Sequence, residues 1–203
     1  MSKTVIFDIG GVYFCDGTQI AIGSIASRYK LKPGMVANIL NGDAGEKYRT
    51  GMITAEEFWN QARQHLNIDG SPEELSAMWY QSYQPDAGTI RIIGRLRKAG
   101  HQILYLSNNT GERVAYLNRR YGFLDKFDDG IFSHLVKRKK PDPVIYQLIL
   151  AKASHAAGAC VYIDDKPHFL KPAQDLGMTV IAFKNSSQLA DELKALSLFP
   201  DGH

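Results

Sequence analysis

The sequence predicts an α/β fold: a doubly wound parallel sheet with a small helical cap inserted after the first strand. Five short apolar runs have the length of strands, at residues 4–7, 103–106, 130–132, 160–163 and 179–183. The first, second and fourth runs are apolar at consecutive positions, which is typical of parallel strands covered on both faces. Helical patterns separate the later runs, and this alternation implies right-handed crossovers in a single sheet.

The helices between the predicted strands show apolar residues at helical spacing. They are expected at residues 89–99, 113–121, 143–152 and 169–176. Gly100, Gly122 and Gly177 follow three of them directly, and glycine often ends a helix because it tolerates the left-handed conformation there. These helices and the five strands make up the predicted core domain, residues 1–14 and 89–203.

Residues 15–88 differ from the core, because they contain helical patterns and no convincing strand. Thr54 and Glu57 in "TAEEFW" form a capping-box pattern, which marks a helix start. We interpret residues 15–88 as a helical cap domain over the sheet, with a simple extension of the core as the alternative. Helices in it are expected near residues 20–29, 34–40, 54–65 and 72–81.

Composition and charge exclude several classes of protein. The 203 residues include 24 basic and 21 acidic side chains, and a net charge of +3 is too small to indicate a nucleic-acid or membrane surface. No apolar run reaches the ~18 residues of a membrane span, and we expect no secretory signal at the N-terminus. Cys15 and Cys160 fall in no metal-binding spacing, which favours a reducing, cytoplasmic location.

Polar side chains collect where the predicted strands end. In an open parallel sheet, ligands bind beyond the carboxyl ends of the strands. Asp8 follows the first strand, and Lys140 lies in the segment after the third. The polar residues after the second and fourth strands are Ser107, Asn108, Asn109, Asp164 and Asp165. The topology therefore brings three carboxylates, one hydroxyl and one ammonium group to a single edge.

This set of groups suits phosphate chemistry with a metal. Three carboxylates at close range repel one another unless a cation lies among them, and oxygen ligands of this kind suit Mg²⁺. A hydroxyl and an ammonium group can hold the oxygens of a phosphate. Asp8 is the best placed nucleophile, because it follows a buried strand and precedes two glycines. Ordinary structural roles are the alternative: Ser107 or Asn108 can cap a helix, and Lys140 ends a basic run.

Four segments, in this order, resemble the motifs of the haloacid dehalogenase-like (HAD) superfamily. "VIFDIGGVYF" is similar to the first motif, "ILYLSNN" to the second, "KKPDPVIY" to the third and "VYIDDKPHFLKPAQDLGM" to the fourth. "GMITAEEFW" resembles a cap segment of the branch that contains sugar-phosphate phosphatases and the amino-terminal domain of epoxide hydrolases. The resemblance implies a HAD Rossmann-like core and covers essentially the whole chain, more loosely in the cap.

The resemblance also implies a role for each residue at the edge of the sheet. Asp8 would be the catalytic nucleophile and a Mg²⁺ ligand, and Gly10 would offer its backbone carbonyl to the metal. Asp165 would bind the metal directly, and Asp164 directly or through water. The cap would close over the substrate. The residues implied to bind the phosphoryl group are Ser107, Asn108 and Lys140, of which Ser107 and Lys140 are also catalytic.

Two positions depart from the resemblance. Many phosphatases of this family have a second aspartate two residues after the nucleophile, which protonates the leaving group, and here that residue is Gly10. Such a loss typically lowers the rate ~10²–10⁴-fold, which favours a good leaving group such as a sugar anomeric phosphate. Phe169 stands where this branch often has asparagine, and we expect it to pack a helix under the edge. The residues nearest in sequence that could replace the acid are Asp16, His134 and His168.

The cap offers two groups of residues to a substrate. The segment "EKYRTG", residues 46–51, is expected to be a polar turn. Its Lys47, Tyr48 and Arg49 are either solvated or meet a sugar hydroxyl or a second phosphate. The aromatic residues expected to pack the cap first, and to form a substrate platform second, are Trp59, Trp79 and Tyr80.

The leading expectation is a Mg²⁺-dependent phosphatase that hydrolyses a small phosphorylated metabolite, with a sugar phosphate favoured, through an aspartyl-phosphate intermediate. A 2-haloacid dehalogenase would use the same aspartate without metal, although the pair Asp164 and Asp165 argues against it. A catalytically weakened binding or regulatory protein is suggested by Gly10. We expect no nucleic-acid or membrane partner, and a monomer or a homodimer.

Overall fold

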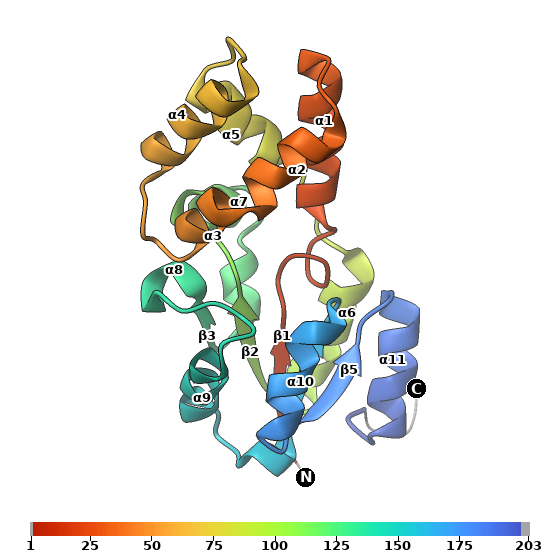
Figure 1. The fold of residues 1–203 in the computed structure, drawn as a ribbon. Coiled ribbons are helices and arrows are strands. Elements are labelled where there is room, and N and C mark those ends of the chain that lie inside the picture. Colours follow the sequence, from red (N-terminus) through yellow and green to blue (C-terminus); the bar gives the residue numbers. More distant parts are fainter. Residues whose placement is uncertain (1, 200–203) are drawn as a thin grey trace.

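The structure is a computed structural model, and it describes residues 2–199. Five strands form one parallel sheet in the order β3-β2-β1-β4-β5, as Figure 1 shows. All five predicted strands are confirmed to within one residue at each end, and so is the α/β fold. The bounds are β1 Thr4–Phe7, β2 Gln102–Ser107, β3 Asp129–Phe132, β4 Cys160–Asp164 and β5 Thr179–Ala182.

The central strand β1 is buried on both faces. Val5, Ile6 and Phe7 have no exposed surface. Ile6 belongs to one hydrophobic cluster, and Val5 and Phe7 belong to the other. Because side chains alternate along a strand, a consecutive apolar run supplies both faces of the sheet.

Helices cover both faces of the sheet. α9 and α10 contribute buried residues to the cluster that contains Ile6, and α6, α7 and α11 contribute to the cluster that contains Phe7. α6 begins two residues before the predicted start, because the Asp86 side chain caps it by accepting a hydrogen bond from Thr89 N at 2.6 Å. The bounds are α6 Ala87–Lys98, α7 Gly111–Tyr121, α9 Pro143–Lys152, α10 Pro167–Asp175 and α11 Ser186–Ala195.

Two helices of the core lie outside the sequence prediction. α11 is capped by Asn185, which accepts a hydrogen bond from Gln188 N at 2.9 Å, and it buries Leu189 and Leu193. These two leucines are one helical turn apart, so the pattern for a helix is present in the sequence. The other helix, α8 at Ser133–Val136, is a single turn after β3. Short 3₁₀ turns complete the core, at Phe123–Lys126 and Ala157–Ala159.

Helices α1 to α5 lie together beyond the carboxyl end of the sheet, in the upper part of Figure 1. The predicted capping box is present at the start of α4, where Thr54 and Glu57 satisfy each other's backbone N–H groups. The division of the chain at residues 15 and 88 stays a prediction. The bounds are α1 Gly17–Tyr29, α2 Pro33–Asn41, α3 Asp43–Arg49, α4 Ala55–Leu66 and α5 Pro72–Gln81.

The predicted polar turn at residues 46–51 is wrong in its first part, because residues 46–49 form the last turn of α3. This short helix has acidic residues in its first turn and basic residues in its last, an order that suits the helix dipole. Tyr48 anchors it: the side chain is buried and stacks on Phe58 with 4.8 Å between ring centroids. A single buried tyrosine among polar residues gives little periodicity from which to predict a helix.

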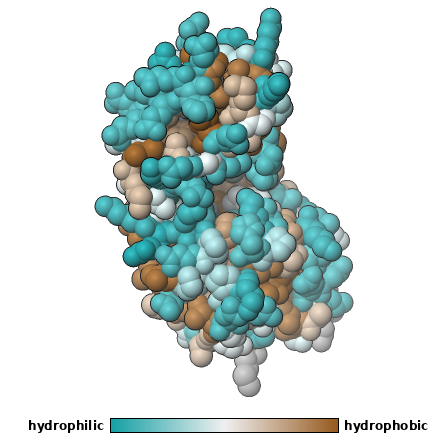
Figure 2. Space-filling view, in the orientation of Figure 1, coloured by the Kyte–Doolittle hydropathy of each residue, from teal (hydrophilic) through white to brown (hydrophobic). Residues whose placement is uncertain are grey.

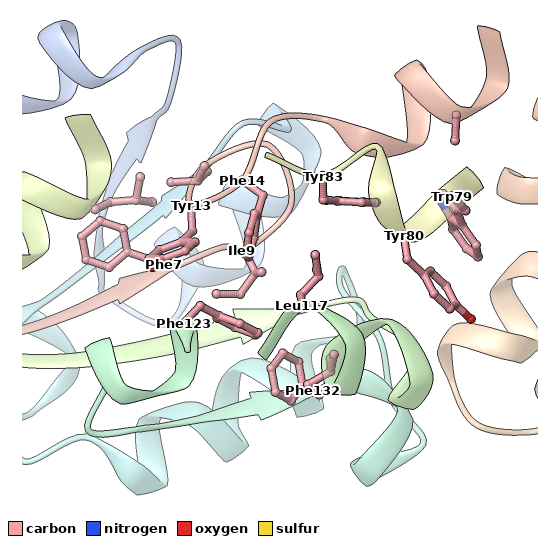
Figure 3. Packing of buried hydrophobic residues seen from close by; sticks show 14 of the residues in the cluster. Phe7, Ile9, Tyr13, Phe14, Trp79, Tyr80, Tyr83, Leu117, Phe123 and Phe132 are labelled. Atoms are coloured by element: carbon pink, nitrogen blue, oxygen red, sulfur yellow. The ribbon is translucent and has the colours of Figure 1, made fainter. Parts of the chain in front are cut away.

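The hydrophobic core runs without a break from the sheet into the cap. One cluster of buried residues contains both Phe7 of β1 and Trp79 of α5, and Figure 3 shows the aromatic rings between them. Phe14 contacts Tyr83 with ring centroids 6.4 Å apart. The predicted packing role of Trp59, Trp79 and Tyr80 is confirmed, because all three are buried. In the part of the chain that the structure describes, no helix is long and apolar enough to cross a membrane.

Candidate active site

A pocket of about 430 Å³ lies between the carboxyl edge of the sheet and the cap. Figure 2 shows a notch between the upper and lower parts of the molecule, with hydrophilic side chains around it. Asp164 is fully buried and Asp165 is half-buried, each with a carboxylate oxygen within 4.8 Å of one of Asp8. The predicted site residues that line the pocket are Asp8, Gly10, Ser107, Asn108 and Lys140.

Asp8 is the first residue after β1, and the sheet fixes its backbone. Its N–H donates to Ile163 O of β4 at 2.9 Å, so the pairing of β1 with β4 continues through the aspartate. The side chain lines the pocket although only 5% of the residue is exposed. Burial raises the pKa of Asp8 against the opposing effect of Lys140. A carboxylate held this way is rigid and poorly solvated.

Lys140 is a buried cation between two carboxylates. Its Nζ lies 2.9 Å from Asp8 Oδ1 and 2.6 Å from Asp164 Oδ2. Burial opposes the ammonium charge, but the two carboxylates outweigh it and raise the pKa of Lys140. Phe169 lines the pocket beside it, with its ring centroid 5.0 Å from Nζ. Phe169 therefore lies against the lysine, and its expected packing under the edge stays a prediction.

Asn108 holds the backbone of Lys140 from both sides. Its Oδ1 accepts from Lys140 N at 2.8 Å, and its Nδ2 donates to Lys140 O at 3.0 Å. The alternative that Ser107 or Asn108 caps the next helix is wrong, because Thr110 is the N-cap of α7. Ser107 ends β2 and lines the pocket. The turn after β2 thus joins the hydroxyl and the ammonium group at one edge.

The two adjacent aspartates have different surroundings. Asp164 is satisfied by the protein: Oδ2 accepts from Lys140 Nζ and from the Tyr162 hydroxyl, and Oδ1 accepts from Lys166 N at 2.9 Å. Asp165 Oδ1 is buried and has no hydrogen-bond partner among residues 2–199. Burial and the charge of Asp8 raise the pKa of Asp165 to about 7. Asp165 is therefore the carboxylate without a direct ion pair in residues 2–199, and the charge of Lys166 lowers its pKa only from a distance.

The carboxylate cluster fits a divalent cation. Asp8, Asp164 and Asp165 each offer an oxygen, and these atoms all lie within 4.8 Å of one another. Lys140 is the one cation paired with the cluster in residues 2–199, whereas Lys166 acts on Asp8 and Asp165 only from a distance, so three carboxylates still outnumber the cations, and one oxygen of Asp165 has no hydrogen-bond partner. Hard oxygen donors of this kind suit Mg²⁺. The residues present thus match the metal that the sequence predicts.

The two glycines after Asp8 differ in what they allow. Gly11 has φ +97°, and a Cβ there would lie 2.5 Å from the Asp165 carboxylate, so glycine is required for the two to approach. Gly10 lines the pocket without a positive φ. A Cβ on Gly10 would meet only Tyr83 Cε1, at an ordinary 3.5 Å. Neither crowding nor backbone conformation therefore explains the missing aspartate at residue 10.

The three candidates for a replacement acid lie in different places. Asp16 and His168 line the pocket, and His134 does not. Asp16 also caps α1, where Oδ1 accepts from Gln19 N at 3.2 Å. His134 Nδ1 lies 2.9 Å from Asn109 O, away from the pocket wall. The structure brings Asp16 and His168 to the pocket without assigning either a role.

Sequence reasoning missed several residues that shape the pocket. Tyr162, on β4, donates to Asp164. Arg113, on α7, lines the pocket and is buried, and Tyr83 accepts a hydrogen bond from it at 2.8 Å. An arginine three residues into a polar helix start reads as an exposed residue, and only its position under the cap shows otherwise.

Comparisons with known proteins agree with this geometry. The family model for haloacid dehalogenase-like hydrolases matches residues 2–177. The sesquiterpene phosphatase astK of Aspergillus oryzae is 25% identical over 201 residues, which cover 96% of each chain. Acyl-CoA dehydrogenase family member 10 of Mus musculus is 28% identical over 98% of this chain, which spans only 19% of the mouse protein.

Solved structures share the fold. A HAD family enzyme from Bacteroides thetaiotaomicron, solved with magnesium and inorganic phosphate, superposes with a TM-score of 0.75 at 20% identity, over 91% of this chain and 96% of that one. L-2-haloacid dehalogenase from Xanthobacter autotrophicus gives 0.66 at 19% identity, over 98% and 85%. With a family model matching most of its length, this chain is a member of the haloacid dehalogenase-like hydrolase family.

Proposed function

We propose that this hydrolase is a Mg²⁺-dependent phosphatase that cleaves a small phosphorylated metabolite through an aspartyl-phosphate on Asp8. The observation that carries the proposal is the charge arrangement: Asp8 is held by Lys140 at 2.9 Å, and an unpartnered Asp165 oxygen lies close by. In that arrangement the Asp8 carboxylate faces the pocket, and a separate carboxylate oxygen, on Asp165, can bind a cation. The relative solved with magnesium and phosphate, and the fungal phosphatase, support it.

In this proposal Asp8 attacks phosphorus and the bond to the leaving oxygen breaks. Lys140 holds the Asp8 carboxylate in place and offsets negative charge on the phosphoryl oxygens. Ser107, at the end of β2, binds the phosphoryl group with Asn108 beside it. Water then cleaves the acyl-phosphate and frees Asp8. Asp164 keeps Lys140 charged and oriented.

Asp8, Asp165 and the Gly10 carbonyl are proposed to hold the metal, with Asp164 behind them. When bound, Mg²⁺ supplies positive charge for the phosphoryl oxygens and orients them. Asp164 is the weakest candidate for direct ligation, because three donors already occupy its oxygens. This favours the indirect of the two roles expected for it.

The missing acid at Gly10 favours a substrate whose leaving group needs little protonation. A sugar anomeric phosphate meets this condition, and we propose a sugar phosphate as the substrate class. The reaction is proposed to be cytoplasmic, since Cys15 and Cys160 are free thiols that suit a reducing compartment. The enzyme is proposed to act as a monomer or a homodimer.

The test is a phosphatase screen over sugar phosphates, nucleotides and phosphorylated acids, with Mg²⁺ and with a chelator. We expect turnover only with the metal, and a loss of about 10⁴-fold in kcat with Asp8→Asn. Beryllium fluoride with Mg²⁺ should form an adduct on Asp8 that protects the protein against heat. Release of phosphate from a substrate by Asp8→Asn at the wild-type rate would refute Asp8 as the nucleophile.

The same experiments separate the two alternatives. A 2-haloacid dehalogenase would release halide from 2-chloropropionate whether or not the chelator is present. A non-catalytic binding protein would give neither turnover nor a beryllium fluoride adduct. The vacant oxygen of Asp165 favours the metal-dependent reaction over both.

A further inference from the structure

Two arginines lie on the cap side of the pocket, opposite in charge to the carboxylate cluster. Arg49 comes from the end of α3 and Arg113 from the first turn of α7, and both line the pocket. Their Cζ atoms lie 5.3 Å and 4.6 Å from the centroid of one buried ring, that of Trp79. The tryptophan thus holds two like charges beside one cavity.

The partners of both guanidinium groups are neutral. Arg113 donates to Asn109 Oδ1 at 2.6 Å and to the Tyr83 hydroxyl at 2.8 Å. Arg49 donates to Leu40 O at 2.7 Å. These bonds fix the direction of each side chain without an ion pair, and Glu46 and Asp16 raise the pKa of Arg49 only from a distance.

No carboxylate lies within 4.0 Å of either guanidinium group in residues 2–199. Glu46, the acid of α3 that lines the same pocket, pairs instead with Lys139 at 2.6 Å. Burial and the charge of Arg113 lower the pKa of Arg49 to about 10. Two cations that repel each other in a partly desolvated wall are stabilised by an anion between them.

We propose that Arg49 and Arg113 form a second anion subsite, so that the substrate carries a phosphate or carboxylate in addition to the phosphoryl group that is cleaved. The inference rests on the proposed phosphatase function and narrows its substrate class to sugar bisphosphates and phosphorylated acids. Bidentate recognition of such groups is the usual role of arginine forks.

The subsite is connected to the reacting end of the pocket. Arg113 also donates to Asn108 O at 3.4 Å, and Asn108 holds the backbone of Lys140. Asn108 therefore lies between Arg113, which is proposed to bind the distal anion, and Lys140, which is proposed to bind the phosphoryl group. A substrate of a few carbon atoms can bridge them within a pocket of about 430 Å³.

The test uses two matched pairs of probes: 3-phosphoglycerate with glycerol 3-phosphate, and glucose 1,6-bisphosphate with glucose 1-phosphate. We expect wild type to prefer the first member of at least one pair in kcat/KM. Arg49→Gln should lower kcat/KM for that member about 10- to 100-fold and for its partner less than about 3-fold. Arg49→Lys keeps the charge but not the planar guanidinium group, and its kcat/KM for that member should lie between the values for wild type and Arg49→Gln. Lys47→Gln, on the same helix but paired with Asp43 on the surface, is the matched control and should change neither.

Binding to Asp8→Asn, measured by calorimetry, separates this inference from the proposed function. Tighter binding of the probe with the second anion, lost in Asp8→Asn with Arg49→Gln, would support the subsite even if no probe is hydrolysed. Equal affinity and equal kcat/KM within both pairs, or an equal loss for both members in Arg49→Gln, would overturn it. Phosphatase activity with no preference would leave the proposed function standing and remove the subsite.

Discussion

The sheet side and the cap side of the pocket differ in the partners of their charged side chains. On the sheet side, Lys140 is bonded to Asp8 and Asp164, and the surplus is negative. On the cap side, Arg49 and Arg113 make hydrogen bonds only to neutral oxygens, although the carboxylates of Asp16 and Glu46 also line the pocket. The first arrangement suits a cation and the second suits an anion. The difference supports the proposal that the strand ends carry the reaction and that the cap side selects the substrate.

The largest expected effect comes from the sheet side. Asp8→Asn removes the nucleophile and should lower kcat by about 10⁴-fold for every substrate, because the loss does not depend on the leaving group. Phosphate release at saturating substrate measures it. If Asp8→Asn lowered kcat only for substrates with a second anion, the proposed difference in role between the sheet side and the cap side would be refuted.

A smaller effect is expected at Gly11, through the metal ligand. Gly11→Ala places a Cβ 2.5 Å from the Asp165 carboxylate and forces it to move. Mg²⁺ affinity should fall about 10- to 100-fold, the loss typical when a residue that positions a metal ligand is changed. Titration of activity with Mg²⁺ gives the change. Gly94→Ala is the control, since a Cβ on Gly94 meets nothing within 4 Å, and a similar weakening there would argue against a local effect.

The surplus negative charge also predicts how stability depends on pH. Without metal, the Asp165 carboxyl of the folded protein binds its proton below about pH 7, whereas an unperturbed aspartate carboxyl does so only below pH 3.8. Between these values the folded state holds more protons, so the free energy of unfolding falls as pH rises. The fall should amount to about 1–3 kcal/mol, less than the full shift because Asp165 is partly exposed.

Thermal unfolding in chelator at pH 5, 6, 7 and 8 measures this dependence. Asp165→Asn should flatten the dependence of stability on pH and should be more stable than wild type at pH 8 without metal. Added Mg²⁺ should stabilise wild type at pH 8 but not Asp165→Asn. A wild-type curve that rises with pH over this range would contradict the assignment of Asp165 as the uncompensated acid.

The smallest effect is expected on the cap side. Tyr83→Phe removes the hydroxyl that accepts from Arg113 at 2.8 Å and should change kcat/KM about 2- to 10-fold. The change should be confined to substrates with a second anion. Tyr121→Phe, whose hydroxyl donates to Gln84 and to the Tyr83 backbone but has no bond to Arg113, serves as the comparison. Equal losses in both variants would point to general loosening of the aromatic core.

The sheet could be predicted from the sequence because its signals are local. Val5, Ile6 and Phe7 show burial on both faces by being apolar in succession, and Asp8 marks the strand end. Parallel topology then brings the strand ends together, so the carboxylates, Ser107 and Lys140 could be grouped without coordinates. The different surroundings of Asp164 and Asp165 could not, since Tyr162 and the Lys166 backbone reach Asp164 only in three dimensions.

The cap side was harder to predict, because its contacts join distant segments. Arg113 is polar in a polar helix start, and its burial depends on Trp79 and Tyr83 from the end of the cap. Arg49 belongs to a short helix whose only strong anchor is Tyr48. Neither residue carries a periodic signal, so the sequence offered Arg49 as a candidate substrate contact but indicated neither Arg113 nor the pairing of the two.

The open space beside Gly10 has an evolutionary consequence. Some glycine codons become aspartate codons by one base change, and a Cβ at residue 10 would meet only Tyr83 Cε1, at an ordinary 3.5 Å. From such a codon, a single mutation would place a carboxyl group next to Asp8. In the proposed mechanism that group would widen the range of alcohols released, while Arg49 and Arg113 would still select the distal anion.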